Sequence, residues 1–146
     1  MVLWRISRYQ DLNGTGGLKA GGRWHYPGQP VVYLSESAAS ALLEVCVHTS
    51  ANDVPPSFTL LRIEGPDVDV PSVAESDLSN GWRVRIGETQ EIGTTWLHQR
   101  DTALLQVPSA IVPATRNYLL NPAHPDASAY RIQEALNYPF DVRLKF

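Results

Sequence analysis

An arginine in a glycine-rich segment is the first side chain that could bind an anionic ligand. Arg23 is the third residue of a Gly-Gly-Arg-Trp-His segment. Glycine allows a backbone to approach a ligand closely, and a guanidinium donates two parallel hydrogen bonds to a phosphate while it stays charged. The segment therefore favours a phosphate or pyrophosphate site at Arg23. The alternative is an ordinary loop arginine that contacts carbonyl groups or solvent.

Glu44 is the candidate acid, and it lies in a segment with helical periodicity. The predicted helix begins at a Ser35 or Ser37 cap and runs to about His48. Its apolar residues form two faces and comprise Ala38, Ala41, Leu42, Val45 and Cys46 on one and Leu43 and Val47 on the other. We therefore expect a largely buried helix, in which a carboxylate is costly unless a partner or ligand satisfies it. In the alternative, Glu44 faces water and pairs with His48 one turn later.

A tyrosine and a serine also have positions that permit contact with a ligand. Tyr33 lies in a β-branched and aromatic run that predicts a strand leading into the Glu44 helix. Its ring either stacks on a flat aromatic ligand or packs in the core. Ser109 follows Pro108, but no Gly-x-Ser-x-Gly pattern surrounds it, which argues against a hydrolase nucleophile.

Several common kinds of site lack their sequence patterns. The glycines before Arg23 are not followed by the Gly-Lys-Ser/Thr of a Walker loop. Those at 14–17 lack the helix and the acidic residue of a dinucleotide fingerprint. The four histidines have no metal-ligand spacing, so we expect no metal site. Cys46 is the single cysteine, which rules out an internal disulfide and suits a reducing compartment.

The elements that position these residues are predicted to be short. The chain has 11 prolines and 10 glycines, which favours a strand-rich α+β domain over a helical bundle. Strands are predicted at 2–6, 31–34, 58–63, 104–107, 110–112 and 142–146. A second helix is predicted at 88–97, loops at 13–22 and 66–81, and a segment leading into a turn at 117–122.

Length and composition restrict the class of protein. The 146 residues suffice for one domain, which we place at 1–146. Apolar residues make up 43% and charged residues 18%, as in globular proteins. The net charge of −3 and the pI of about 5.7 argue against a partner nucleic acid, which needs clustered basic residues. No signal peptide and no apolar run near the roughly 18 residues of a membrane span are visible. We therefore expect a cytoplasmic protein.

These segments together resemble the RES-domain family, which is named for its Arg, Glu and Ser. The matching segments follow in order along nearly the whole chain, at 4–6, 21–25, 31–35, 42–45, 107–113, 117–122 and 124–125. Any one of them is a weak signal, but their combination is specific. The segment at about 67–99 carries no matching motif.

The resemblance implies an ADP-ribosyltransferase-like fold, with two small packed β-sheets and flanking helices around an NAD cleft. It also implies the toxin of a bacterial toxin–antitoxin pair, which degrades NAD as its substrate and needs no cofactor. The partner would be an Xre-like helical antitoxin that blocks the active site.

By the same resemblance, the family's Arg, Glu and Ser are Arg23, Glu44 and Ser109 of this chain. Tyr33 matches a further tyrosine of the family's site, and we count all four as catalytic residues. Arg5 and Asn117 match family positions, which adds them to the expected NAD-binding residues.

The residues also fit the chemistry of cleaving the nicotinamide–ribose bond. The transition state resembles an oxocarbenium ion, and a carboxylate beside the ribose stabilises its positive charge. Glu44 takes this role, and no general acid is required because nicotinamide leaves as a neutral molecule. Arg23 would bind the pyrophosphate, Tyr33 would flank the nicotinamide, and Ser109 would contact the ribose or orient Glu44. Water or phosphate would accept the ribosyl group.

Three other functions stay open from the sequence. One is a protein ADP-ribosyltransferase, although the Glu-x-Glu pair of arginine-specific transferases is missing because Leu42 lies two residues before Glu44. Another is a ribonuclease toxin, against which the acidic composition argues. The third is a non-catalytic nucleotide-binding module.

Overall fold

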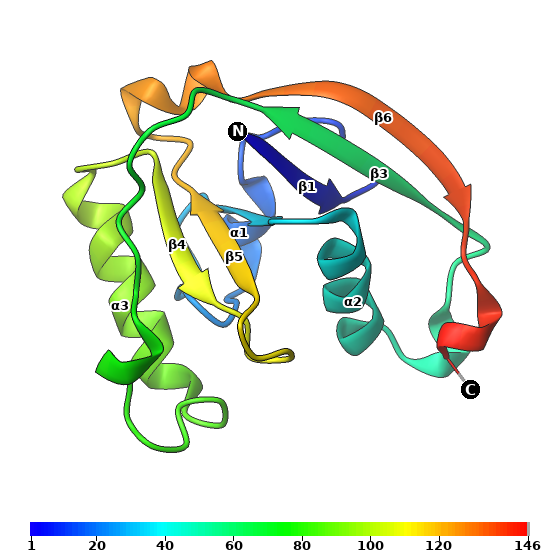
Figure 1. The fold of residues 1–146 in the computed structure, drawn as a ribbon, viewed down its shortest axis with the longest axis horizontal. Coiled ribbons are helices and arrows are strands. Elements are labelled where there is room, and N and C mark those ends of the chain that lie inside the picture. Colours follow the sequence, from blue (N-terminus) through cyan, green and yellow to red (C-terminus); the bar gives the residue numbers. More distant parts are fainter. Residues whose placement is uncertain (146) are drawn as a thin grey trace.

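The computed structural model describes residues 1–145, which form a mixed α+β fold, as predicted (Figure 1). The strands are β1 (Val2–Ile6), β2 (Val32–Ser35), β3 (Ser57–Glu64), β4 (Leu104–Pro108), β5 (Arg116–Leu120) and β6 (Arg131–Pro139). The α-helices are α1 (Thr15–Lys19), α2 (Ala38–His48) and α3 (Ile86–Gln99). Short 3-10 helices lie at η1 (Ala51–Asp53), η2 (Glu75–Asp77), η3 (Pro125–Ala129) and η4 (Val142–Leu144).

The strands form one antiparallel sheet in the order β4-β5-β2-β1-β3-β6, where two packed sheets were expected. The centre of this sheet is narrow, because β1 and β2 pair only at Trp4 and Ser35. On either side of this junction, β2 pairs with β5 and β1 with β3 along their lengths. The β4-β5-β2 and β1-β3-β6 halves therefore diverge, as Figure 1 shows, but they belong to one continuous sheet and are not two packed sheets.

Two hydrophobic cores pack against the sheet. Helix α3 covers the β4-β5 side, where Trp96 and Leu97 pack with buried residues of β4 and β5. The second core spans both halves, since it joins Leu3 of β1 and Ile63 of β3 to Leu34 of β2 and to buried residues of β4 and β5. Helix α2 contacts β1 and β2, so it lies at the junction of the halves (Figure 1).

Helix α2 begins and ends as predicted but is less buried than predicted. Its N-cap is Ser37, whose side chain accepts a hydrogen bond from the backbone N–H of Ser40 over 3.0 Å. The second apolar face is open, since Leu43 is 37% and Val47 53% exposed. Only one side of the helix packs on the sheet, which explains why the prediction of a largely buried helix is wrong.

The predictions at 2–6, 31–34, 58–63, 104–107 and 88–97 are confirmed to within a few residues. The predicted strand at 110–112 is wrong, because these residues form a turn and β4 pairs instead with β5 at 116–120. The 13–22 loop contains the short helix α1.

The C-terminal strand was also misplaced. The final strand is β6 at 131–139, an exposed edge strand in which Glu134 interrupts the alternation of Ile132, Leu136 and Tyr138. The predicted strand at 142–146 is a 3-10 helix at 142–144, and Phe146 lies outside the described residues.

Candidate functional site

A cavity of about 600 Å³ lies where the two halves of the sheet meet, with walls from β1, β2, α2, β5 and two loops. This volume falls in the range of small-molecule sites. The walls are largely apolar, and their charged and polar side chains include Arg5, Arg23, Tyr33, Glu44, His48 and Asn117. The fold thus brings five of the six predicted site residues to one cavity from distant parts of the sequence.

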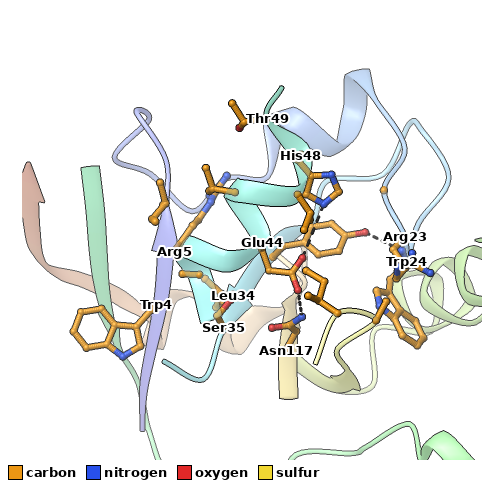
Figure 2. A pocket seen from close by; sticks show the side chains of 18 of the residues that line it. Trp4, Arg5, Arg23, Trp24, Leu34, Ser35, Glu44, His48, Thr49 and Asn117 are labelled. Carbon is orange, nitrogen blue, oxygen red and sulfur yellow. Dashed lines mark hydrogen bonds and ion pairs between the residues drawn. The ribbon is translucent and has the colours of Figure 1, made fainter. Parts of the chain in front are cut away.

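The Glu44 carboxylate lies between an amide and an imidazole (Figure 2). Asn117 of β5 donates a hydrogen bond from Nδ2 to Glu44 Oε1 over 2.8 Å. His48 Nε2, one turn along α2, lies 3.9 Å from Glu44 Oε2. The Glu44 side chain is 32% exposed. Both expectations for this residue hold in part, because Glu44 faces the cavity and also lies beside His48.

The Asn117 amide has a fixed orientation. A carboxylate only accepts hydrogen bonds, so the NH₂ group must face Glu44 and the amide oxygen must point away from it. That oxygen, Oδ1, is buried and has no hydrogen-bond partner within residues 1–145. The Asn117 amide therefore orients the Glu44 carboxylate. The sequence had instead pointed to Asn117 as a residue that binds the ligand directly.

Arg23 is held by two neighbouring residues from far along the chain, Trp82 and Arg83. Its Nη1 donates a hydrogen bond to the Arg83 carbonyl oxygen over 2.9 Å. Its guanidinium carbon lies 5.9 Å from the centre of the Trp82 ring, a cation–π distance. Trp82 is buried against Trp24, with 6.3 Å between ring centres. Since a guanidinium carries several N–H donors, these contacts orient Arg23 and still leave donors for an anion.

Helix α3 supports the loop that carries Arg23. The Thr89 hydroxyl donates a hydrogen bond to the Arg23 carbonyl oxygen over 2.5 Å. At Gly93, an added Cβ would lie 1.7 Å from the carbonyl oxygen of Trp24, so the helix touches the loop backbone. The segment 67–99, which carries no recognisable motif, therefore forms the wall behind Arg23.

The Tyr33 hydroxyl is already engaged by two protein groups. It accepts a hydrogen bond from the Trp24 backbone N–H over 3.0 Å and lies 2.7 Å from His25 Nδ1. Burial raises the pKa of Tyr33 to about 12, so the hydroxyl stays protonated at neutral pH. Because Tyr33 lines the cavity, its ring is the part available to a flat ligand.

Arg5 brings a second guanidinium to the cavity from β1. Its Nη1 donates a hydrogen bond to the carbonyl oxygen of Asp11 over 3.3 Å. Burial lowers the pKa of Arg5, but a guanidinium stays charged in proteins. The cavity therefore contains two cations and one acid, in a protein whose net charge is −3.

Ser109 does not line the cavity, contrary to the expectation that it contacts the ribose or orients the acid. It is 4% exposed, and its Oγ accepts hydrogen bonds from the backbone N–H groups of Ile111 and Val112 over 3.1 and 3.3 Å. These bonds form a serine turn in place of the predicted strand. Its two neighbours, Pro108 and Ala110, do line the cavity. Ser109 therefore shapes a wall of the site.

Several residues that complete the site could not be recognised in the sequence. His48 appeared only as an exposed partner of Glu44, although the i, i+4 spacing could have placed it in the cavity. His25 is buried beside Tyr33, and Trp82 and Arg83 hold Arg23 from far along the chain. No spacing rule connects positions about 60 residues apart, so these contacts needed the fold.

Two kinds of feature are absent from the described part of the chain. Within residues 1–145, no group of His, Cys, Asp and Glu side chains could hold a metal ion. None of the helices in this range is both long and apolar enough to cross a membrane.

The chain is similar over nearly its whole length to known proteins of one family. The model of the RES domain family matches residues 2–141. "Toxin Res" of Pseudomonas putida is 48% identical over 91% of this chain and 92% of its own length. "Prs ADP-ribosylating toxin" of a Sphingobium species is 36% identical over 97% of this chain and 94% of its own.

Among solved structures, one chain of the M. tuberculosis MbcT–MbcA toxin–antitoxin complex matches with a TM-score of 0.78. It is 18% identical, and the match covers 94% of this chain and 84% of that one. At this identity, the match supports the fold.

Proposed function

The chain belongs to the RES-domain family of toxins, and on this premise we propose that it acts by breaking the nicotinamide–ribose bond of NAD. One observation carries the proposal: Arg23, Tyr33 and Glu44 line one cavity of about 600 Å³. A cation, an aromatic ring and a carboxylate are the groups that a dinucleotide with a cationic pyridine ring requires.

Glu44 supplies the stabilisation of the transition state. As the bond to nicotinamide breaks, positive charge moves from the pyridinium to the ribose, and a nearby carboxylate lowers the energy of that charge. The bond between Asn117 Nδ2 and Glu44 Oε1 fixes the carboxylate before the substrate arrives. Its half-buried position strengthens the attraction, because fewer water molecules screen it.

The other residues bind and orient the substrate. Arg23 binds the pyrophosphate, and Arg5 adds a second positive charge to the same cavity. Tyr33 flanks the nicotinamide with its ring. Its hydroxyl is not the proton donor of the reaction, because it is engaged within the protein and nicotinamide leaves without needing a proton. Ser109 holds the loop at 109–112 in shape.

Two reactions are possible, which differ in the molecule that accepts the ribosyl group. Water gives ADP-ribose, and phosphate gives ADP-ribose 1-phosphate, with nicotinamide released in both. A protein acceptor is the second candidate function, favoured by the name of the Sphingobium relative, "Prs ADP-ribosylating toxin". Leu42 occupies the place of the first acid of a Glu-x-Glu pair, which argues against an arginine acceptor.

The proposed partner is an Xre-like helical antitoxin that covers the cavity. Its support is the family resemblance and the M. tuberculosis structure, which is a toxin–antitoxin complex. Such a partner would exclude NAD from the cavity. Co-expression of a small helical protein encoded beside this chain should therefore restore growth and NAD content together.

The experiment is to measure NAD in cells that express the wild type, Glu44→Gln or Glu134→Gln. Glu134 is an exposed residue of β6 and serves as the matched control. We expect the wild type and Glu134→Gln to deplete NAD, and Glu44→Gln to leave it unchanged. Growth arrest with intact NAD and degraded RNA would contradict the proposal. Mass spectrometry of the same lysates for ADP-ribosylated proteins distinguishes the two candidate functions.

A further inference from the structure

A chain of buried and partly buried hydrogen bonds runs from α1 through His25 and Tyr33 to the loop that carries Arg23. His25 is 2% exposed and lies at its centre. His25 Nε2 is 3.0 Å from the carbonyl oxygen of Ala20 and 3.3 Å from that of Gly17. On the other side of the ring, Nδ1 is 2.7 Å from the Tyr33 hydroxyl.

The partners of each group determine where the protons lie. Carbonyl oxygens only accept hydrogen bonds, so Nε2 of His25 must carry a proton. Burial lowers the pKa of His25, which favours a neutral ring with a bare Nδ1. The Tyr33 hydroxyl therefore donates its proton to Nδ1. A lone pair of the same oxygen accepts the backbone N–H of Trp24 over 3.0 Å.

Both neighbours of Arg23 in the sequence meet at this one hydroxyl. Trp24 donates its backbone N–H to it. Gly22 approaches it so closely that an added Cβ would lie 2.5 Å from the Tyr33 oxygen. The Gly22 N–H also donates to the His25 carbonyl oxygen over 3.1 Å, which closes the loop. The position of the Tyr33 hydroxyl thus determines the backbone position of Arg23.

We propose that His25 is a positioning residue for Arg23: by accepting the Tyr33 proton, it turns a lone pair of that oxygen towards Trp24 and fixes the loop. The role rests on the proposed function, in which Arg23 binds the pyrophosphate of NAD. His25 itself touches no substrate, since its ring is hydrogen-bonded to the Tyr33 hydroxyl and to the carbonyl oxygens of Gly17 and Ala20. The buried imidazole acts on substrate binding and takes no part in bond cleavage.

The first test is spectroscopic and needs no activity. Nitrogen NMR of the wild type at neutral pH should show His25 as a neutral ring with its proton on Nε2. The Trp24 amide should exchange slowly with solvent, because its N–H is bonded within the protein. A ring protonated on Nδ1, or a fully protonated ring, would overturn the proposal.

The second test separates a positioning role from a structural one with two substitutions. His25→Asn can keep a hydrogen-bond acceptor near the place of Nδ1, whereas His25→Leu keeps none. We expect His25→Leu to raise the KM for NAD about tenfold and to change kcat less than about threefold, because a displaced Arg23 weakens binding. We expect His25→Asn to restore KM to within about threefold of the wild type. His98→Leu, which removes an exposed histidine of α3, is the control.

The outcomes decide separately on the positioning role and on the proposed function. An unchanged KM in His25→Leu, or equal damage in the Asn and Leu variants, would overturn the positioning role. If His25→Leu does not fold, the NMR signature of the wild type and the KM of His25→Asn decide. If the wild type consumes no NAD, the proposed function fails. In that case, faster exchange of the Trp24 amide in His25→Asn than in the wild type would contradict the rescue, and equal exchange would support it.

Discussion

Glu44 and Arg23 are held by different kinds of contact, and we expect the loss of each residue to change a different kinetic constant. The side-chain amide of Asn117 fixes the Glu44 carboxylate through a hydrogen bond. The backbone carbonyl of Arg83 and the indole ring of Trp82 fix the Arg23 guanidinium. In the proposed function, the acid would face the developing charge and the guanidinium would face the substrate's own charge, so kcat and KM should respond separately.

Replacing Arg23 by alanine should mainly weaken substrate binding. In the proposed function, the guanidinium would contact the pyrophosphate equally in the ground state and the transition state, so its loss should raise KM more than it lowers kcat. A lost charge-assisted pair is worth about tenfold or more in KM. Steady-state kinetics with NAD measure the change, and Arg131→Ala on exposed β6 is the control. An Arg23→Ala variant with wild-type affinity for NAD would contradict the pyrophosphate role.

Replacing Asn117 by alanine should mainly slow cleavage. Without the 2.8 Å bond to Asn117, the Glu44 carboxylate loses its fixed orientation before the substrate binds. We expect kcat to fall about tenfold, with a smaller change in KM. If KM alone changed, Asn117 would instead be a direct ligand of NAD, as the sequence first suggested.

Among the elements, those with strong local signals were predictable and those defined by long-range pairing were not. Strand β1 alternates in the sequence, and α2 has a serine cap and an apolar stripe, so both were placed correctly. Strand β6 is exposed on most positions, and Glu134 interrupts the alternation of Ile132, Leu136 and Tyr138, so its sequence gives only a weak strand signal. Ser109 captures two backbone N–H groups and converts an apolar run at 110–112 into a turn.

The site was partly predictable for the same reason. Arg23, Tyr33 and Glu44 stand in recognisable segments, and the structure brings them to one cavity. The supports behind Arg23 come from 82–93, which has no motif, and their role depends on contacts across the fold. The role of His25 could not be identified from the sequence, because no sequence motif marks a histidine that is buried and bonded to other groups of the protein.

Helix α3 should control the site through its contact with the Arg23 loop. At Gly93 a methyl group would collide with the carbonyl oxygen of Trp24, so Gly93→Ala should push the loop away. We expect a loss of about 1–3 kcal/mol in the free energy of unfolding and a raised KM for NAD. Gly87→Ala is the matched control in the same helix, because its added Cβ would meet nothing within 4 Å beyond its chain neighbours and the backbone of its own helix.

Urea denaturation and NAD kinetics on the two variants measure these effects. The control should be neutral or more stable by about 0.4–1 kcal/mol, because alanine restricts the unfolded chain and favours helix. Equal stability of Gly93→Ala and Gly87→Ala would contradict the role of α3.

For the molecule as a whole, the narrow junction of the sheet creates the cavity. Only the pair Trp4 and Ser35 joins β1 to β2, and both residues line the cavity. One hydrophobic core spans both halves and holds them together, so the cavity beside the junction need not be filled by side chains. Positive charge in this space, within an acidic protein, favours one enclosed anionic ligand over a long nucleic acid.

The stability of the whole protein should depend on the charge of His25. Its pKa is lowered from 6.5 in the folded state, so the unfolded chain binds the proton more readily. The free energy of unfolding therefore keeps its full value above pH 6.5 and falls as the pH drops towards the lower folded-state pKa.

Urea denaturation at about pH 7.5 and about pH 5.5 tests this dependence. The decrease between the two pH values should be smaller in His25→Asn than in the wild type. His98→Asn, at an exposed position, should keep the wild-type decrease. Identical decreases in all three proteins would show that His25 is not the group responsible.

The most direct test of the central claim compares binding and turnover in one variant, Glu44→Gln. Glutamine keeps the shape of the side chain and removes its charge. Calorimetry should therefore give an NAD affinity within about threefold of the wild type, while nicotinamide release falls by about a thousandfold or more. Nicotinamide release at the wild-type rate, or a loss of binding that accounts for the whole loss of turnover, would contradict the claim that the Glu44 carboxylate cleaves NAD in this cavity.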